Sequence, residues 1–279
     1  MKDLIQPSEL LKIKHQRNLI LLDARAGGNA AERFTNEHLQ NAQFVDVETE
    51  LAAKPDNAAH GGRHPLPSLF NFATVLGEKG VRKNSRVVIY DDKNAANAAA
   101  RLWWMLKAVG HNSVQVLDGG LQSAKNVGFP TTSEMTFPII QKPYWVNIWF
   151  LPTADILEVE KAAQSLRHTV IDVRDAYRFD GESEPIDLIA GHIPGAINIP
   201  FTENLAADGH FLSPRTLKKK YQTALKRPNT EGVIVHCGSG ITACHTLLAM
   251  SVAGLPMPKL YVGSWSEWSR NGKAIGKKD

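Results

Sequence analysis

Hydrophobic and polar positions follow one another along the chain in blocks that predict strands and helices in alternation. In the first half, short apolar runs at 19–25, 86–90 and 114–117 predict buried strands. Apolar residues with helical spacing near 68–78 and 95–109 predict helices between them. Strands that alternate with helices in this way are typical of parallel α/β units.

The second half repeats this order of elements. Pro152 to Leu157 predicts a helix start like the one at Pro7, and 169–174 predicts a buried strand. Ser213 followed by Pro214 predicts the N-cap and first turn of another helix. The last expected elements are a strand at 233–235, a helix at 244–253 and a strand at 260–263.

Matching positions indicate that the two halves arose by duplication. We therefore expect two domains of the same α/β type, at residues 1–129 and 152–279. A linker is expected at 130–151, which contains Pro138 and Pro143. The matching positions are Asp23-x-Arg25 with Asp172-x-Arg174, His38 with His192, Gly110 with Gly254, and Gly119 with Gly263.

Composition favours an intracellular globular enzyme. The chain has 279 residues, 43% hydrophobic and 22% charged, which is enough to bury a full core. Its first residues lack the apolar region of a signal peptide, and no apolar run approaches the roughly 20 residues of a membrane span, so we expect a cytoplasmic protein with no membrane partner. The net charge is only +4, and the basic run 218–220 lacks an aromatic platform, so no nucleic-acid partner is expected. The ten histidines and two cysteines show no ligand spacing, and we expect no metal and no cofactor.

The chemistry is expected at Cys237, directly after a short apolar run rich in β-branched residues. The residues after it read Gly-Ser-Gly-Ile-Thr-Ala and lead into the helical pattern that begins at Cys244. In such a strand–loop–helix unit, the loop N–H groups and the positive end of the helix favour a negative charge on the first loop residue. We therefore expect Cys237 to be a thiolate nucleophile and Cys244 to pack in the core.

The corresponding loop of the first half differs in its chemistry. Aligning 88–91 with 234–237 places Asp91 opposite Cys237, and the loop 92–97 lacks the Gly-Ser-Gly sequence. A carboxylate at this position would repel the anions that a thiolate-binding loop favours. The first half is therefore expected to be non-catalytic, to line one side of the active site and to stabilise the second half.

The sequence resembles the two-domain sulfurtransferases of the rhodanese family. The resemblance covers essentially the whole chain and rests on the duplicated order, on Gly191-His-Ile-Pro-Gly-Ala-Ile-Asn198 and on Cys237-Gly-Ser-Gly-Ile-Thr-Ala243. It implies an α/β fold of tandem rhodanese-like domains, each a mostly parallel sheet flanked by helices. The loop is more similar to the Cys-Gly-Ser-Gly-Val-Thr-Ala type of 3-mercaptopyruvate sulfurtransferases than to the Cys-Arg-Lys-Gly type of thiosulfate rhodaneses.

The activity that the resemblance implies is transfer of a sulfane sulfur from a small donor, 3-mercaptopyruvate or thiosulfate. The sulfur would pass through a persulfide on Cys237 to a thiophilic acceptor such as cyanide or a thiol, a thioredoxin-like reductant among them. The hydroxyl groups of Ser239 and Thr242 would add hydrogen bonds to those of the backbone. For Thr242, capping of the following helix is an equally good explanation. The loop residues expected to bind the substrate are Gly238, Ser239, Gly240, Ile241, Thr242 and Ala243.

Two further residues match functional positions of the family. Arg178, in Tyr177-Arg-Phe-Asp-Gly181, matches the substrate arginine, and its planar guanidinium suits a carboxylate or a thiosulfonate. His64, in Gly61-Gly-Arg-His-Pro-Leu-Pro67, matches a histidine placed near the active site, as a donor ligand or a proton relay. Arg174 aligns with Arg25 of the other half and is better explained as an ion-pair partner of nearby carboxylates.

The identity of the donor is left open by two opposing features. Gly238 and Ser239 keep the loop neutral, which favours a monoanionic keto acid over the thiosulfate dianion. Ile186, however, stands after Glu184-Pro185, where mercaptopyruvate-specific members have a second arginine. The competing hypothesis is a non-catalytic rhodanese-like binding or sulfur-carrier module. A cysteine phosphatase would require an arginine six positions after the cysteine to bind phosphate. This chain has Ala243 there, which disfavours a phosphatase.

Overall fold

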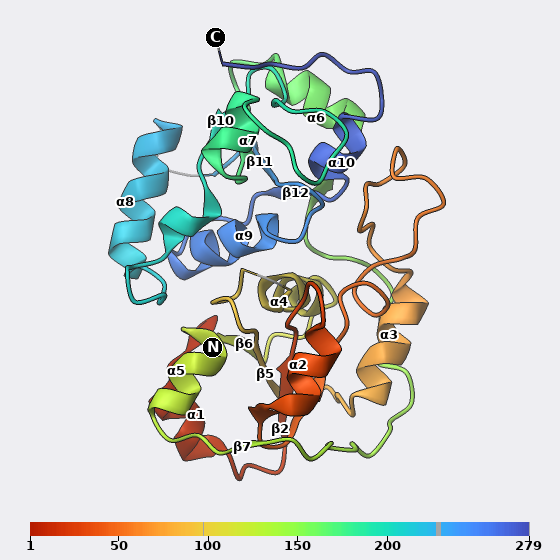
Figure 1. Ribbon diagram of the computed structural model, residues 1–279, viewed down its shortest axis with the longest axis vertical. Coiled ribbons are helices and arrows are strands. Elements are labelled where there is room, and N and C mark those ends of the chain that lie inside the picture. The colour runs from red at the N-terminus through yellow and green to blue at the C-terminus, as the bar shows by residue number, and fades with distance from the viewer. Residues whose placement is uncertain (97, 227–229, 279) are drawn as a thin grey trace. The chain divides into compact units, whose positions relative to one another are not determined.

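The protein forms two compact α/β units, described from a computed structural model that covers residues 1–96, 98–226 and 230–278 (Figure 1). The segment 54–66 packs with the second unit although it comes from the first half of the chain. Residue 97 of the loop after Asp91 and residue 279 of the expected second domain lie outside the described residues. The first unit holds 1–53, 67–150 and 207–211, and the second holds 54–66, 151–206 and 212–279.

A parallel sheet flanked by helices forms the first unit. The sheet strands are β1 (Leu4–Ile5), β2 (Leu19–Asp23), β4 (Ala42–Phe44), β5 (Arg86–Tyr90) and β6 (Val114–Leu117). The helices are α1 (Pro7–Ile13), α2 (Ala30–Asn36), α3 (Leu69–Glu78), α4 (Ala99–Ala108) and α5 (Gly120–Asn126). The sheet order is β1-β6-β5-β2-β4, and its central strands are apolar and buried, with α1, α2 and α5 sharing one core with them and α4 packed on β5 and β6. A separate antiparallel pair joins β3 (His38–Leu39) to β7 (Thr131–Thr132).

The second unit repeats this plan. Its sheet strands are β8 (Thr153–Ala154), β9 (Thr169–Asp172), β10 (Ile197–Asn198), β11 (Val233–His236) and β12 (Lys259–Tyr261). Its helices are α6 (Ile156–Ala163), α7 (Ala176–Asp180), α8 (Pro214–Leu225), α9 (Ala243–Val252) and α10 (Ser264–Trp268), with the 3₁₀ turn η1 (Phe201–Asn204) before α8. The sheet order is β10-β9-β11-β12-β8, and every pair in it is parallel.

Strand order confirms the duplication. The first sheet, written as β4-β2-β5-β6-β1, corresponds strand by strand to the second, β10-β9-β11-β12-β8. Corresponding strands also follow one another in the same order along the chain. The fold is therefore the predicted pair of mostly parallel α/β domains.

The helix predicted from Pro152 begins later than expected. Pro152 precedes the strand β8, in which Thr153 and Ala154 pair with β12. The helix α6 begins at Ile156 after its N-cap Asp155, whose carboxylate accepts a hydrogen bond from the Glu158 N–H at 2.8 Å. The predicted N-cap Ser213 is confirmed, because its side chain accepts from the Thr216 N–H at the start of α8.

The expected linker packs with the first unit. Its Gln141 N–H donates to Gly77 O at 2.9 Å, its Tyr144 N–H donates to Ala73 O at 2.8 Å, and Tyr144 is buried. After β7 the described residues up to Phe150 form no helix or strand. The backbone of this segment is held by hydrogen bonds to α3 and its end rather than by a regular element of its own.

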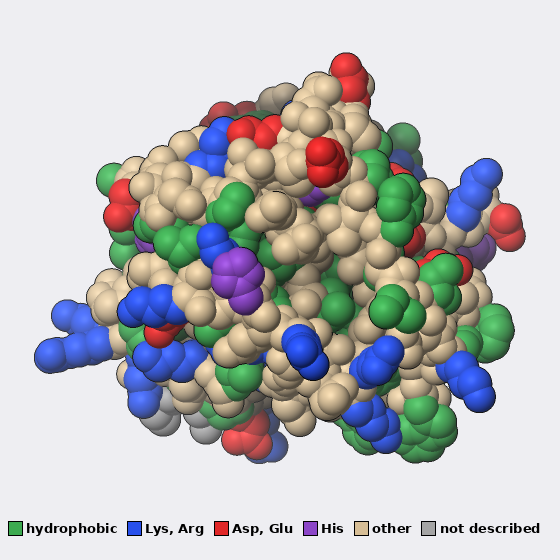
Figure 2. All heavy atoms as spheres, turned by 90° about the horizontal axis from the view of Figure 1, so that it is seen from below, with side chains coloured by type: hydrophobic (Ala, Val, Ile, Leu, Met, Phe, Trp, Pro, Cys, Tyr) green, Lys and Arg blue, Asp and Glu red, His purple; other side chains and the backbone are tan. Residues whose placement is uncertain are grey.

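The surface carries mixed charge on the face shown in Figure 2. Lys and Arg side chains are spread there, with Asp, Glu and hydrophobic side chains between them. Of the helices that the structure describes, none is long and apolar enough to cross a membrane. Within the described residues, no group of three or more His, Cys, Asp and Glu could hold a metal ion.

Candidate active site

Cys237 lies at the carboxyl end of the central strand β11, where the chain turns into α9. The strand and nearly the whole of α9 are buried, which fixes both ends of the connecting loop. The Sγ atom of Cys237 accepts a hydrogen bond from the Gly240 N–H at 3.1 Å. Gly240 has φ +76°, a conformation that glycine adopts without steric cost. The loop therefore turns a backbone donor toward the sulfur.

The backbone of Cys237 is held by the turn that opens α10. Its N–H donates to Ser264 Oγ at 3.2 Å, and its carbonyl oxygen accepts from the Trp265 N–H at 3.0 Å. The next carbonyl, that of Gly238, accepts from the Ser266 N–H at 2.9 Å. Cys237 is 1% exposed, so the sulfur is presented from a fixed and enclosed position.

The remaining loop residues differ in their surroundings. Ser239 is buried, and Thr242 is the N-cap of α9 but makes no side-chain capping hydrogen bond. Cys244 is buried in α9, where its thiol donates to Gly240 O at 3.5 Å. Both cysteines are free thiols.

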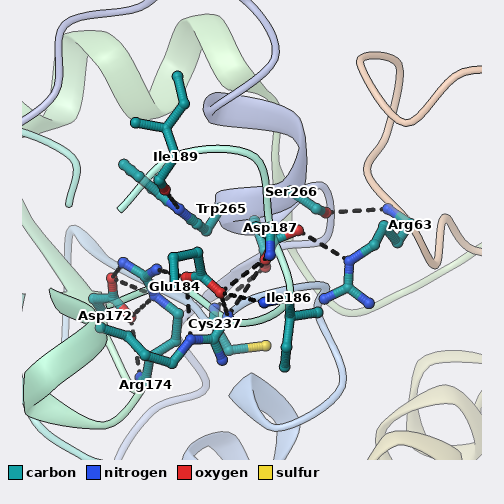
Figure 3. Close-up of polar contacts among 12 residues, drawn as sticks. Arg63, Asp172, Arg174, Glu184, Ile186, Asp187, Ile189, Cys237, Trp265 and Ser266 are labelled. Carbon is teal, nitrogen blue, oxygen red and sulfur yellow. Dashed lines mark hydrogen bonds and ion pairs between the residues drawn. The ribbon is translucent and has the colours of Figure 1, made fainter. Parts of the chain in front are cut away.

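A chain of alternating charges runs beside the loop (Figure 3). Arg174 donates from Nε and Nη2 to the Asp172 carboxylate at 2.6–3.0 Å, and from Nη1 to Glu184 at 3.0 Å. Arg178 binds the same Glu184 from Nε at 3.1 Å and from Nη2 at 2.7 Å. The interpretation of Arg174 as an ion-pair residue is confirmed, and Arg178 joins it in the network.

Burial and pairing oppose each other in the pKa values of this network. Burial alone would lower the pKa of Arg178, but its hydrogen bond to Glu184, with the charges of Glu184, Asp187 and Cys237, raises it. Burial alone would raise the pKa of Glu184, but hydrogen bonds from Arg178 and from backbone N–H groups lower it. Both shifts keep the pair charged at neutral pH.

Asp187 sits among three guanidinium groups. Its carboxylate accepts from Arg63 Nε at 3.0 Å, from Arg178 Nη2 at 3.4 Å and from Arg270 Nη1 at 3.4 Å. The Asp187 side chain is fully buried, whereas that of Arg63 is 28% exposed. A buried carboxylate needs such partners, because water does not reach it.

These charges face the loop at Gly238. A Cβ atom on Gly238 would lie 3.4 Å from Arg178 Nη2, from Arg63 Nη2 and from Asp187 Oδ2. The loop is neutral by sequence, but two guanidinium groups and a carboxylate stand directly beside it. In Figure 3 the Cys237 sulfur points toward the side of the view from which Arg63 enters.

The segment 54–66 brings Arg63 to this position. The Arg63 N–H donates to Ser266 Oγ at 3.0 Å, and the Gly61 N–H donates to Glu267 Oε1 at 2.8 Å. Gly62 has φ +80°, and a Cβ there would come within 2.3 Å of Gly263 O, so only glycine allows this close approach. His64 is buried in the same segment at 7% exposure.

The structure therefore brings together Cys237, its loop and Arg178, and it places beside them two residues that sequence reasoning missed, Arg63 and Asp187. The sequence pattern favours His64 over its neighbour Arg63, and no local pattern points to Asp187. The two glycines before Arg63 were the available signal, since they indicate a close backbone approach. Ile186 is 55% exposed, and its N–H donates to Glu184 Oε1 at 3.1 Å.

Comparison with known proteins decides the family. The family model for the Rhodanese-like domain matches residues 6–126 and 155–271. The chain belongs to the rhodanese family. Its relatives include a Pseudomonas aeruginosa protein named "Probable 3-mercaptopyruvate sulfurtransferase", 38% identical over 95% of this chain and 94% of that protein. The thiosulfate sulfurtransferase of Mus musculus is 34% identical over 86% of this chain and 80% of that protein.

A solved rhodanese structure agrees with the fold. The crystal structure of SseA from Escherichia coli, one of the 3-mercaptopyruvate sulfotransferases, superposes with a TM-score of 0.77 at 28% identity, covering 96% of this chain and all of that one. Because the relatives are sulfurtransferases over nearly their full length, this rhodanese-family protein is an enzyme of the sulfurtransferase kind.

Proposed function

We propose that the protein transfers a sulfane sulfur from 3-mercaptopyruvate, and less efficiently from thiosulfate, through a persulfide on Cys237 to a thiophilic acceptor. The observation that carries this proposal is the Cys237 sulfur at the head of its loop, with the Gly240 N–H aimed at it at 3.1 Å. The acceptor is cyanide or a thiol, including the thiol of a thioredoxin-like reductant.

The first half-reaction begins with attack of the Cys237 thiolate on the donor sulfur. With 3-mercaptopyruvate the S–S bond forms as the C–S bond breaks, and the electron pair left on carbon gives the enolate of pyruvate. The enolate takes up a proton, and pyruvate leaves. With thiosulfate the same attack releases sulfite, which leaves with the electron pair of the broken S–S bond. The persulfide holds the transferred sulfur, and its negative charge faces the loop N–H groups.

The second half-reaction returns Cys237 to its starting state. Cyanide or a thiolate attacks the outer sulfur of the persulfide and forms a bond to it. The S–S bond to Cys237 breaks, and the electron pair stays on the Cys237 sulfur as a thiolate. The products are thiocyanate from cyanide, or a new persulfide from a thiol.

The proposed donor-binding groups are Arg178, His64 and the backbone of residues 238–243. A guanidinium matches the donor carboxylate, and the buried Glu184 holds Arg178 in place. In this proposal 152–279 carries catalysis, 130–151 joins the domains, and 1–129 is non-catalytic because Asp91 stands where Cys237 would be.

A side-by-side steady-state assay with the two donors tests the proposal. We expect turnover with both and a modestly higher kcat/KM for 3-mercaptopyruvate, with pyruvate and the persulfidated acceptor formed in equal amounts. Intact-mass measurement after donor treatment should show the gain of one sulfur, mapped to the peptide of Cys237 and not to that of Cys244.

The outcomes separate the competing hypotheses. A persulfide that forms but is not passed to any acceptor would indicate a sulfur-carrier module. No added sulfur with either donor would indicate a binding module and overturn the proposal. A strong preference for thiosulfate would overturn the assignment of the donor alone.

A further inference from the structure

We infer that Arg63 supplies the second guanidinium for the anionic group of the donor, in place of the arginine that is missing at position 186. This inference rests on the proposed function and names a specificity-determining residue for it. Arg63 lies 124 residues before Asp187 in the sequence, in the segment 54–66, which packs with the second unit.

Arg63 is anchored on one side and open on the other. Its Nε donates to the buried Asp187 carboxylate at 3.0 Å, and its Nη2 lies 3.4 Å from where a Gly238 Cβ would be. Among the residues that the structure describes, Nη1 and Nη2 have no hydrogen-bond acceptor, and the side chain is 28% exposed. The two terminal nitrogens are therefore left to bind a planar anion beside the Cys237 loop.

Arg178 is less available than Arg63. Glu184 takes up its Nε and Nη2 donors, and Asp187 shares the Nη2 donor at 3.4 Å. Among the described residues only its Nη1 has no hydrogen-bond acceptor, so a donor carboxylate that takes a second nitrogen of Arg178 would have to compete with these two acids. The same carboxylate meets no bound acid at the Nη atoms of Arg63.

The charges around Asp187 and Glu184 nearly balance. Four guanidinium groups, of Arg63, Arg174, Arg178 and Arg270, pair with three carboxylates, of Asp172, Glu184 and Asp187. Four positive and three negative charges leave a net charge of +1, which a thiolate on Cys237 offsets. The donor anion is therefore attracted by direct contact with Arg63 rather than by an excess of positive charge.

The position of Arg63 is set before any donor binds. Its backbone is tied to Ser266, and Gly62 in front of it packs against Gly263 O with no room for a side chain. A guanidinium that is already in place loses little conformational freedom on binding the anion. This is a property of a binding residue rather than of a flexible surface arginine.

A purely structural role for Arg63 makes a different prediction. If Arg63 served only to neutralise Asp187, then Arg270 would be equivalent to it, since Arg270 also donates to the Asp187 carboxylate, at 3.4 Å. Arg270 Nη1 is held in addition by Ser266 O at 2.8 Å, and its atoms are not among the three nearest to the Gly238 Cβ position. Arg270→Gln is therefore the matched control for Arg63→Gln.

The first test measures anion attraction without any sulfur transfer. Iodoacetate and iodoacetamide alkylate the same thiol but differ in charge, so the ratio of their rates at Cys237, followed by peptide mass, reports the local field. Arg63→Gln should lower this ratio about tenfold, the size expected for one charge-assisted contact. Arg270→Gln should change it less than threefold, and Arg63→Lys should fall between wild type and Arg63→Gln.

The second test uses donor kinetics on the same variants. For Arg63→Gln, KM for 3-mercaptopyruvate should rise about tenfold or more with a smaller change in kcat, and Arg63→Lys should recover part of the loss. Equal effects of Arg63→Gln and Arg270→Gln on both ratio and KM would overturn the inference in favour of a structural role. An unchanged alkylation ratio in Arg63→Gln would overturn it as well. If wild type transfers no sulfur but shows the Arg63-dependent ratio, the proposed function fails while the anion site stands.

Discussion

In the first unit, the loop after β5 closes its backbone N–H groups around the carboxylate of Asp91. The N–H groups of Lys93 and Ala95 donate to Oδ1 at 2.9 Å each, and that of Ala99 donates to Oδ2 at 3.3 Å. In the second unit the corresponding loop turns the Gly240 N–H toward the Cys237 sulfur. In both loops backbone N–H groups donate to the side chain of the first loop residue. The Asp91 carboxylate cannot accept a sulfur atom, whereas the Cys237 sulfur can bind a further sulfur atom and release it.

The frame around the two loops is nearly the same. Arg25 binds Asp23 as Arg174 binds Asp172, with a shortest contact of 2.6 Å in each case. His38 stacks on Phe34 at 3.9 Å, and its Nδ1 lies 2.7 Å from the Phe34 carbonyl oxygen. His192 makes the same two contacts with Phe179, at 3.8 and 2.7 Å. These repeated contacts attach each histidine to the helix before it, α2 or α7, so the difference in chemistry comes from the loops and the acids near them.

The largest expected effect comes from exchanging the atom in each loop. Cys237→Ser should lower kcat for either donor by about three orders of magnitude or more, because a hydroxyl cannot carry the sulfane sulfur. Asp91→Ser should leave kcat within a factor of about three, although it loosens its own loop. Steady-state assays on folded protein, checked by circular dichroism, make the comparison. A comparable loss of activity in both variants would mean that the first loop is not inert.

Breaking the shared ion pair should destabilise each unit separately. Removing one partner of a buried pair costs roughly 3–5 kcal/mol, so Arg25→Leu should open the first unit and Arg174→Leu the second. Hydrogen exchange followed by peptide mass can assign the loss of protection to one unit. Only Arg174→Leu should also raise the donor KM, because it releases Glu184, to which Arg178 is bound. Loss of protection in the other unit instead would contradict the prediction.

Arg178 and Arg33 occupy matching places, each directly before the phenylalanine that stacks on a histidine. Arg33 pairs with Asp92 at 3.0 Å, whereas Arg178 pairs with Glu184 and faces Gly238. Arg178→Ala should lower kcat/KM for both donors by about one to two orders of magnitude, chiefly through KM, since a charge-assisted contact is worth roughly 1.5–3 kcal/mol. Arg33→Ala is the control and should leave the kinetic constants unchanged. Unaltered constants in Arg178→Ala would show that this arginine does not bind the donor.

Local sequence patterns predicted the longer helices and strands correctly. They did not predict the two-residue strands or the contacts between residues far apart in the sequence. The strand at 86–90 and the helix at Leu69–Glu78 with its Ser68 N-cap have enough residues to show their period. The two-residue edge strands Leu4–Ile5 and Thr153–Ala154 do not, and only pairing with a neighbour defines them. From the sequence alone, the proline before Thr153–Ala154 therefore resembles the start of a helix.

The same distinction holds for the candidate site. Cys237 and its loop could be found because strand, nucleophile and glycines follow one another within a dozen residues. Arg63 and Asp187 are 124 residues apart, so nothing local marks them as neighbours. Gly62 and Gly238 are glycines at positions where other atoms approach the backbone closely. The sequence shows the glycines, but only the structure shows which atoms approach them.

Restoring an arginine at position 186 should sharpen the contrast between the donors. Ile186 is 55% exposed beside Asp187, so a longer polar side chain can be accommodated there. Ile186→Arg should widen the preference for 3-mercaptopyruvate by about tenfold, because one more charge-assisted contact becomes available to the carboxylate. The ratio of the two kcat/KM values measures this, with Ile186→Met as a control for side-chain length. A ratio that stays at its wild-type value would remove position 186 from the account of donor choice.

The residues just before Asp91 and Cys237 should contribute differently to the pH dependence of the two units. Tyr90 precedes Asp91, and burial raises its pKa well above the usual value, so it does not titrate near neutral pH. His236 precedes Cys237, and burial lowers its pKa, with Arg174 acting in the same direction and Asp172 opposing it. In the second unit a neutral histidine is therefore buried where the first unit has a neutral phenol.

The sign of the effect follows from which state binds the proton. The unfolded His236 takes up a proton near pH 6.5, whereas the folded one does so only at lower pH, so its contribution to stability is complete above about 6.5 and is lost as the pH falls. The loss has a limiting slope of about 1.4 kcal/mol per pH unit, and the slowest-exchanging amides of the second unit should report it between about pH 6.5 and 5. His236→Asn should flatten that slope whatever its effect on overall stability. In the first unit burial also lowers the pKa of His111, and this group gives the corresponding slope there. His111→Asn should therefore flatten the slope of stability against pH in the first unit and leave that of the second unit unchanged. A slope in the second unit that survives His236→Asn would mean that another group there titrates on unfolding.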